Sequence, residues 1–134
     1  MSTLRTNALE GMDAKNSITI VAGAGNITTT NVQEGLSKVW SNTSADGTTL
    51  NDSLNVSSLG DSDTGQQNIN FTNAMGNDDY CYTALGGDTS ASLSVRIENA
   101  SNRTTTTIDL ISYNTSNASL DIQDVNSLFH GDLA

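Results

Sequence analysis

Cys81 and His130 are the residues of this chain whose types come closest to a catalytic pair. A cysteine becomes a nucleophile when a neighbouring base or cation favours its thiolate, and His130 is the only histidine in the sequence. The two residues are far apart in the chain, so only the fold could bring them together. Cys81 stands between two tyrosines in a strand-like stretch, where we expect a small buried hydrophobe. As the only cysteine, it forms no internal disulfide and no cysteine zinc site.

Paired carboxylates are the second kind of candidate. Asp78 with Asp79, or Asp61 with Asp63, could in principle serve as the two acids of a glycoside hydrolase. Both pairs lie in turn-rich stretches, where solvated acids are the ordinary outcome. The run DSDTG at 61–65 alternates oxygen ligands as a calcium loop does, but it lacks the bidentate glutamate that completes such a loop. We therefore predict no catalytic residue, no cofactor and no bound metal, leave open a metal shared between subunits, and expect a protein that is not an enzyme.

A β-hairpin has to position this acidic turn. The segment 53–75, SLNVSSLGDSDTGQQNINFTNAM, alternates apolar and polar residues on both sides of a run rich in Gly, Asp and Ser. Glycine and short oxygen-bearing side chains reverse a chain readily. We expect strands at about 53–59 and 67–73, joined by a loop at 60–65.

The same alternation recurs through the rest of the chain, with short turn-rich separators spaced as in antiparallel sandwiches. The further predicted strands lie at 80–86, 91–98, 104–113 and 124–130. Residues 30–40 fit either a helix or a strand, and we predict a short helical turn followed by a strand. The predicted fold is all-β: a small antiparallel β-sandwich, jelly-roll-like, at 46–134. Residues 1–45 form an extended N-terminal arm for attachment and oligomerisation.

The predicted core of the sandwich is thin. It consists of Leu54, Val56, Ile69, Phe71, Leu93, Val95, Ile97, Ile108, Leu110 and Phe129. Aromatic residues make up only 4% of the chain, and most of them should be needed inside. We therefore expect partner subunits to cover some of the apolar surface.

The charge of the chain excludes several classes of partner. The formal net charge is −10, from 15 acidic and 5 basic residues, and it repels both nucleic acid and an anionic membrane surface. The longest apolar run, ITIVAGAG, is far short of the roughly 20 residues that a membrane span needs. The polar start of the sequence contains no signal-peptide core. We expect a protein that is made in the cytoplasm and used without export.

Four stretches of the sequence resemble a structural module of phage virion proteins. They are GLSKVW at 35–40, the hairpin segment at 53–75, NDDYCYTA at 77–84 and FHG at 129–131. The module occurs in tail fibres and other components of the particle surface, and the resemblance runs from about Gly35 to Gly131. It implies a non-enzymatic structural protein on the outside of the virion, made in the host cytoplasm.

Two functions fit this resemblance. One sandwich with one arm, and no long repetitive shaft, favours a capsid decoration or cement protein that binds and reinforces the head shell. The alternative is the knob of a tail fibre or head fibre that binds a host-surface receptor or glycan. Aromatic side chains that could stack on a sugar are Trp40, Tyr80, Tyr82 and Tyr113.

The expected partners are the major capsid protein, or tail and fibre proteins, and further copies of the chain. Sites on an icosahedral shell favour a homotrimer. We assign the subunit or shell contacts to apolar residues of the first third of the chain. They are Ile18, Ile20, Val21, Leu36 and Trp40.

Overall fold

The computed structural model describes residues 19–21, 29–31, 35–44, 48–87, 93–97 and 102–134. The chain divides into two compact units, Met1–Leu36 and Ser37–Ala134. In the first unit, β1 (Thr19–Val21) pairs with β2 (Thr29–Asn31) in antiparallel fashion. Of the arm predicted at residues 1–45, residues 1–18, 22–28, 32–34 and 45 lie outside the described residues.

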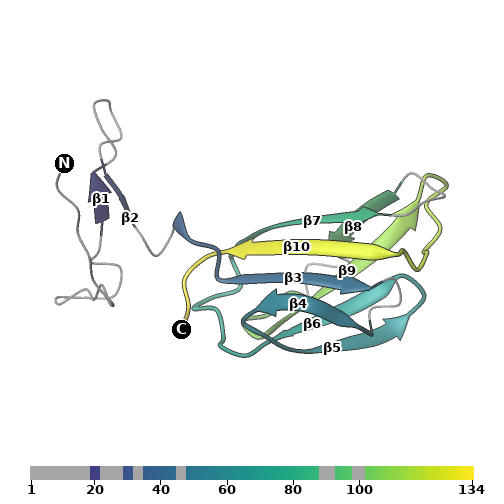
Figure 1. The fold of residues 1–134 in the computed structure, drawn as a ribbon, viewed down its shortest axis with the longest axis horizontal. Coiled ribbons are helices and arrows are strands. Elements are labelled where there is room, and N and C mark those ends of the chain that lie inside the picture. The colour runs from purple at the N-terminus through teal and green to yellow at the C-terminus, as the bar shows by residue number, and fades with distance from the viewer. Residues whose placement is uncertain (1–18, 22–28, 32–34, 45–47, 88–92, 98–101) are drawn as a thin grey trace. The chain divides into compact units, whose positions relative to one another are not determined.

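The second unit is a sandwich of two four-stranded antiparallel sheets (Figure 1). Sheet 1 has the strand order β4-β3-β10-β7, and sheet 2 has the order β5-β6-β9-β8. The strands are β3 (Val39–Ser44), β4 (Leu50–Leu54), β5 (Val56–Asp63), β6 (Gln66–Phe71), β7 (Cys81–Gly87), β8 (Leu93–Ile97), β9 (Thr107–Asn114) and β10 (Asp124–His130). In Figure 1 the yellow β10 lies between β3 and β7. This arrangement confirms the predicted all-β class and the antiparallel sandwich.

The sandwich begins earlier in the sequence than predicted. β3 lies inside sheet 1, between β4 and β10, so the compact unit starts at Ser37 and not at residue 46. The strand predicted for the second half of 30–40 is present, because β3 starts at Val39. The helical turn predicted from Thr30 is wrong at that residue, which pairs with Ile20 in the β1–β2 ladder.

Polar residues inside β3 explain the misplaced boundary. The segment after Trp40 reads SNTS, which is typical of a loop, yet Ser41 and Thr43 are buried. Ser41 Oγ and Ser127 Oγ form a hydrogen bond of 2.7 Å. Thr43 Oγ1 donates to Val125 O at 3.2 Å. These hydrogen bonds remove the cost of burying the hydroxyl groups, so a polar stretch can be a central strand.

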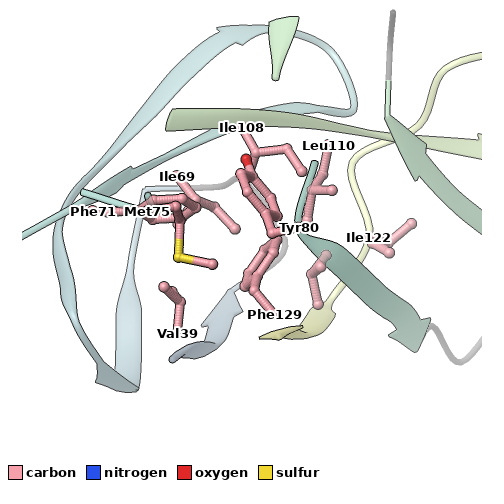
Figure 2. Packing of buried hydrophobic residues seen from close by; sticks show 10 residues of the cluster. Val39, Ile69, Phe71, Met75, Tyr80, Ile108, Leu110, Ile122 and Phe129 are labelled. Carbon is pink, nitrogen blue, oxygen red and sulfur yellow. The ribbon is translucent and has the colours of Figure 1, made fainter. Parts of the chain in front are cut away.

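Apolar side chains from both sheets fill the space between them (Figure 2). The predicted core residues that are buried are Ile69, Phe71, Ile108, Leu110 and Phe129, with Val56 partly buried against them. The core members that were not predicted are Val39, Met75, Tyr80, Ile122 and Val125. Leu93, Val95 and Ile97 lie in β8, and their side chains are outside the described part of the structure.

An aromatic cluster joins the two sheets at one end of this core, where β6 and β10 end and β7 begins. The ring centroid of Phe129 lies 5.5 Å from that of Phe71, 6.1 Å from Tyr80 and 6.2 Å from Tyr82. Phe71 belongs to β6 of sheet 2, whereas Phe129 and Tyr82 belong to sheet 1. Edge and offset contacts of this kind add to the free energy gained by burial. Four of the six aromatic residues of the chain thus lie where the sheets meet.

The prediction that Leu54 lies in the core is wrong, because the chain changes sheets at the next residue. Asn55 has a φ of +60°, and it separates β4 of sheet 1 from β5 of sheet 2. Leu54 and Val56 therefore belong to different strands, and their apparent alternation has no structural meaning. Leu54 is 47% exposed.

The predicted hairpin is confirmed, but its loop is shorter than expected. β5 pairs with β6 as far as Asp63 and Gln66, so Thr64 and Gly65 alone connect the strands. Gly65 has a φ of +74°, a conformation that suits glycine. A Cβ at this residue would lie 2.8 Å from Leu120 N. The glycine therefore lets the turn pack directly on the backbone of the 112–121 segment.

Candidate functional site

The outer face of sheet 1 carries a row of apolar side chains across its strands. Leu54 lies opposite Trp40, Trp40 lies opposite Leu128, and Leu128 lies opposite Thr83. Leu85 follows Thr83 by two residues on β7, so it points to the same side of the sheet. We call Trp40, Leu54, Leu85 and Leu128 the apolar face.

These side chains are open to solvent to an unusual degree. Leu54 is 47% exposed and Leu85 is 73% exposed, while Trp40 and Leu128 are half-buried. A shallow groove of about 320 Å³ lies over β3, β10 and β7, and it is lined by Trp40, Ser41, Asn42, Thr83, Ala84, Leu85, Asn126, Ser127 and Leu128. Exposed apolar residues that gather on one face indicate an interaction surface, whereas scattered ones do not.

Two pairs of adjacent apolar residues, Val39-Trp40 and Leu128-Phe129, indicate this face in the sequence. Consecutive residues of a strand point to opposite sides, and both Val39 and Phe129 are fully buried. Their neighbours Trp40 and Leu128 must therefore point outward, and they lie opposite each other in the ladder. A contact role was predicted from the sequence for Trp40 but not for Leu85 or Leu128.

A network of polar side chains borders the apolar face one row further along the strands. Asn42 Nδ2 donates to Asp124 Oδ1 at 2.7 Å and to Asn126 Oδ1 at 2.8 Å. Asn126 Nδ2 donates to Asp124 Oδ2 at 2.7 Å, and Asn51 Nδ2 donates to Asn42 Oδ1 at 2.8 Å. Because these groups bind one another, they form a fixed polar edge beside Trp40 and its apolar neighbours.

The outer face of sheet 2 differs in character. Asn68 Nδ2 donates to the carboxylate of Asp109, and Asn70 Nδ2 donates to Ser58 Oγ at 3.2 Å. The register also places Ile111 on this side, but its exposed fraction is only 3%. In the described side chains the two outer surfaces are therefore unlike: β5, β6 and β9 of sheet 2 present hydrogen-bonded polar groups together with Ile111 and Tyr113, whereas sheet 1 presents leucines and a tryptophan.

The predicted contact residues are distributed over both units. Trp40 lies on the apolar face of the second unit, whereas Leu36, which is 58% exposed, ends the first unit. Ile20 and Val21 lie in β1, paired with residues of β2. Ile18 is outside the described residues. Their role as contact residues remains a prediction.

Cys81 and His130 lie opposite each other on β7 and β10. Cys81 is exposed, so its predicted burial is wrong. The reason is the alternation along β7, which turns the neighbouring Tyr82 inward to stack on Phe129. Neither Cys81 nor His130 is among the residues that line the groove, and proximity without a third orienting group does not define a nucleophilic site.

Two carboxylates, one from the hairpin and one from the 112–121 segment, hold the backbone of the hairpin turn. Asp63 Oδ1 accepts a hydrogen bond from Thr64 N at 2.8 Å, and Asp121 Oδ1 accepts one from Gly65 N at 2.6 Å. Within the described ranges, no group of three His, Cys, Asp or Glu side chains could hold a metal ion. The hydrogen bonds to Thr64 N and Gly65 N give Asp63 and Asp121 a structural role in the turn.

Tyr80 is not free to stack on a ligand. It is buried, its hydroxyl donates to Thr104 O at 3.1 Å, and the Arg103 guanidinium lies 5.6 Å from the ring centroid. Burial raises the pKa of Tyr80 to about 12, although the positive charge of Arg103 partly opposes the shift. Tyr82 is occupied by Phe129, so two of the four aromatic residues considered for sugar stacking serve the core.

In the part of the chain that the structure describes, no helix is long and apolar enough to cross a membrane. Comparison with known proteins gives no match: no family model, no curated protein and no solved structure is similar to the chain. Function is therefore inferred from the residues themselves and from the contrast between the two outer faces.

Proposed function

We propose that this chain is a non-enzymatic structural protein on the exterior of a phage particle, and that it acts as a capsid decoration or cement protein. The observation that supports this proposal best is the apolar face. An apolar row on a rigid sheet, bordered by polar groups that are already paired, suits a permanent contact with another protein surface. The resemblance of residues 35–131 to a module of virion proteins supplies the setting.

The mechanism is mechanical. A decoration protein adds contact area across the joints of the shell, so that pressure from packaged DNA has to break these contacts as well. The sandwich contributes stiffness, because its two sheets are joined by the aromatic cluster around Phe129. The acidic character of the chain keeps it from binding the packaged nucleic acid. The partners in this proposal are the major capsid protein and further copies of the chain, with a homotrimer as the form suited to shell sites.

The groove beside Trp40 favours a second candidate function, the knob of a tail fibre or head fibre. Its volume of about 320 Å³ lies at the lower end of the range of ligand sites. Asn42 and Asn126 line it and form part of the hydrogen-bonded edge. An indole ring next to fixed amide groups could bind a glycan on the host surface.

The copy number of the chain in purified particles separates the two candidates. Quantitative mass spectrometry would measure it relative to the major capsid protein. A ratio close to that of the shell lattice sites supports decoration, whereas a few copies per particle support a fibre knob. Absence of the chain from purified particles would overturn both.

A further inference from the structure

We propose that the free edge of β7 binds an extended, basic segment of a partner protein, which adds to the four-stranded sheet 1 as a further strand. The inference deepens the proposed function, on which it rests, by naming the edge that holds the partner and the chemistry of the segment that fits it. Figure 1 shows β7 at the margin of sheet 1, beside β10. Within the described residues, β7 pairs with β10 alone. Alternate residues of such an edge strand direct both their N–H and their C=O groups away from the sheet.

The other three edge strands have features that hinder the addition of a strand. Register shifts interrupt the pairing of β4 once and that of β5 twice. Each of these edge strands also contains charged residues: Asp52 in β4, Asp61 and Asp63 in β5, and Arg96 in β8. Bulges and charged side chains are the usual means by which proteins protect the edge of a sheet.

β7 has neither kind of protection. Its seven residues pair with seven consecutive residues of β10 without a register shift. None of the seven is charged, and Gly86 and Gly87 have no side chain that could cover the backbone. A regular, uncharged edge of this length is suited to pairing with an extended segment of another chain.

The side chains of β7 define the apolar part of the segment. Leu85 is 73% exposed, and it lies opposite Asn126 of β10. A strand on the free side of β7 would place one of its own side chains directly opposite Leu85, on the outer side of sheet 1. An apolar residue at that position would cover Leu85 and extend the apolar face by one strand. Because side chains alternate along a strand, the segment should alternate apolar and polar residues.

The charges at the ends of β7 favour a basic segment. Asp78 and Asp79 precede the strand and are exposed, and Asp124 lies opposite its last residue. Among the side chains that the structure describes near the start of β7, the cations are Lys38, which is buried, and Arg103, which lies over a core tyrosine. Lysine or arginine residues at both ends of the segment would therefore meet carboxylates. A second copy paired through its own β7 would bring acidic ends together, so the partner is a different protein.

Three synthetic peptides test the chemistry of the segment. The first alternates valine and threonine and has two lysines at each end. The second has glutamates in place of the lysines. The third keeps the lysines but is methylated at its central backbone nitrogens, so that neither of its edges can pair. We expect the first peptide to bind the full chain, and the other two to bind about tenfold or more weakly, as measured by the fluorescence anisotropy of the labelled peptides.

Two variants locate the binding site. Leu85→Asp changes a side chain that is 73% exposed, so the fold should survive. It should weaken binding of the lysine peptide about tenfold by removing the apolar contact, whereas attraction by charge alone would become stronger. Ser58→Asp adds the same charge to β5, the edge strand with two register shifts, and is the matched control. We expect this control to bind the peptide at least as well as the wild type.

Hydrogen exchange of the backbone amides, followed by NMR on the full chain, reports on the edge itself. In the free chain, alternate amides of β7 should exchange quickly, whereas the amides bonded to β10 should exchange slowly. The lysine peptide should slow the fast set on β7 and leave the amides of β4 and β5 unchanged.

Four results would overturn the inference. They are slow exchange of every β7 amide in the free chain, no binding of the lysine peptide, equal binding of the methylated peptide, and binding that Leu85→Asp leaves unchanged or strengthens. Failure of the inference is distinguishable from failure of the proposed function. A chain that is abundant in particles but binds no peptide at β7 removes only the edge site, whereas a chain that binds the peptide but is absent from particles removes only the virion role.

Discussion

Replacement of Asn55 by alanine should destabilise the sandwich through two separate effects. Asn55 connects sheet 1 to sheet 2 with a φ of +60°, a conformation that asparagine tolerates much better than alanine. Its side chain also binds the chain after β6. Asn55 Oδ1 accepts hydrogen bonds from Asn73 N at 2.7 Å and from Asn73 Nδ2 at 3.0 Å, and Asn55 Nδ2 donates to Asn73 O at 3.1 Å.

The two effects have comparable sizes. Alanine in the left-handed region costs about 1 kcal/mol relative to asparagine. Each exposed hydrogen bond contributes about 0.5 kcal/mol, the lower end of the usual range, so the three together contribute about 1.5 kcal/mol. We therefore expect Asn55→Ala to lower the free energy of unfolding by about 2 to 3 kcal/mol. Asn55→Gly keeps the backbone conformation and should lower it by about 1 to 2 kcal/mol.

Urea unfolding of the full chain, followed by circular dichroism and by the fluorescence of Trp40, measures these differences. The order of stability should be wild type, then Asn55→Gly, then Asn55→Ala. If the alanine and glycine variants were equally stable, the backbone conformation would not matter. If alanine cost less than about 0.5 kcal/mol, the corner between the sheets would not be held as described.

Three further predictions concern the turn, the core and the dependence on pH. Gly65→Ala should lower the free energy of unfolding by about 2 kcal/mol or more, measured by thermal or urea unfolding, because a Cβ would lie 2.8 Å from Leu120 N and φ is positive. In the control Gly60→Ala the nearest atom to the Cβ would be Asn68 Cβ at 3.4 Å, so the loss should be less than half as large. Equal losses in the two variants would refute the packing of the turn. Phe129→Ala removes the fully buried ring between Phe71, Tyr80 and Tyr82 and should cost about 3 to 5 kcal/mol; a loss below about 1 kcal/mol in calorimetry would contradict a central role for this ring. Burial raises the pKa of Tyr80 to about 12, from about 10 in the unfolded chain, so the unfolded chain loses the hydroxyl proton at lower pH than the folded protein does. The free energy of unfolding should therefore fall by up to about 3 kcal/mol as the pH rises from about 10 to about 12. Tyr80→Phe should lack this part of the decline, and an identical alkaline decline in both proteins would refute the assignment.

The sheet class and several strands could be predicted because alternation is a local property. β10 begins and ends where the sequence placed it, at Asp124 and His130, and Ile69 and Phe71 point into the core as their period of two requires. The hairpin around Gly65 was likewise visible from its turn residues, although four residues of its predicted loop extend β5.

The features that could not be predicted from the sequence depend on pairing between residues that are distant in the chain. Nothing local distinguishes Asn55 from its neighbours, yet the chain changes sheets there, and the outward position of Leu54 follows from that change. Ser41 and Thr43 can lie in a central strand because their hydroxyl groups form hydrogen bonds with groups distant in sequence, Ser127 Oγ and Val125 O.

The apolar face depends on long-range pairing in the same way. Leu85 and Leu128 come together with Trp40 only once β7, β10 and β3 are neighbours. The adjacent pairs Val39-Trp40 and Leu128-Phe129 did indicate that one member of each must face outward, but not that these members meet.

The most direct test of the account is the copy number of the chain in purified phage particles, measured by quantitative mass spectrometry for Leu85→Asp and for Ser58→Asp side by side. If the apolar face is the contact through which the chain is held on the virion, the Ser58 variant should be incorporated at the wild-type level and the Leu85 variant should be strongly depleted. Equal incorporation of the two variants would show that the face has no part in assembly and would contradict the central claim.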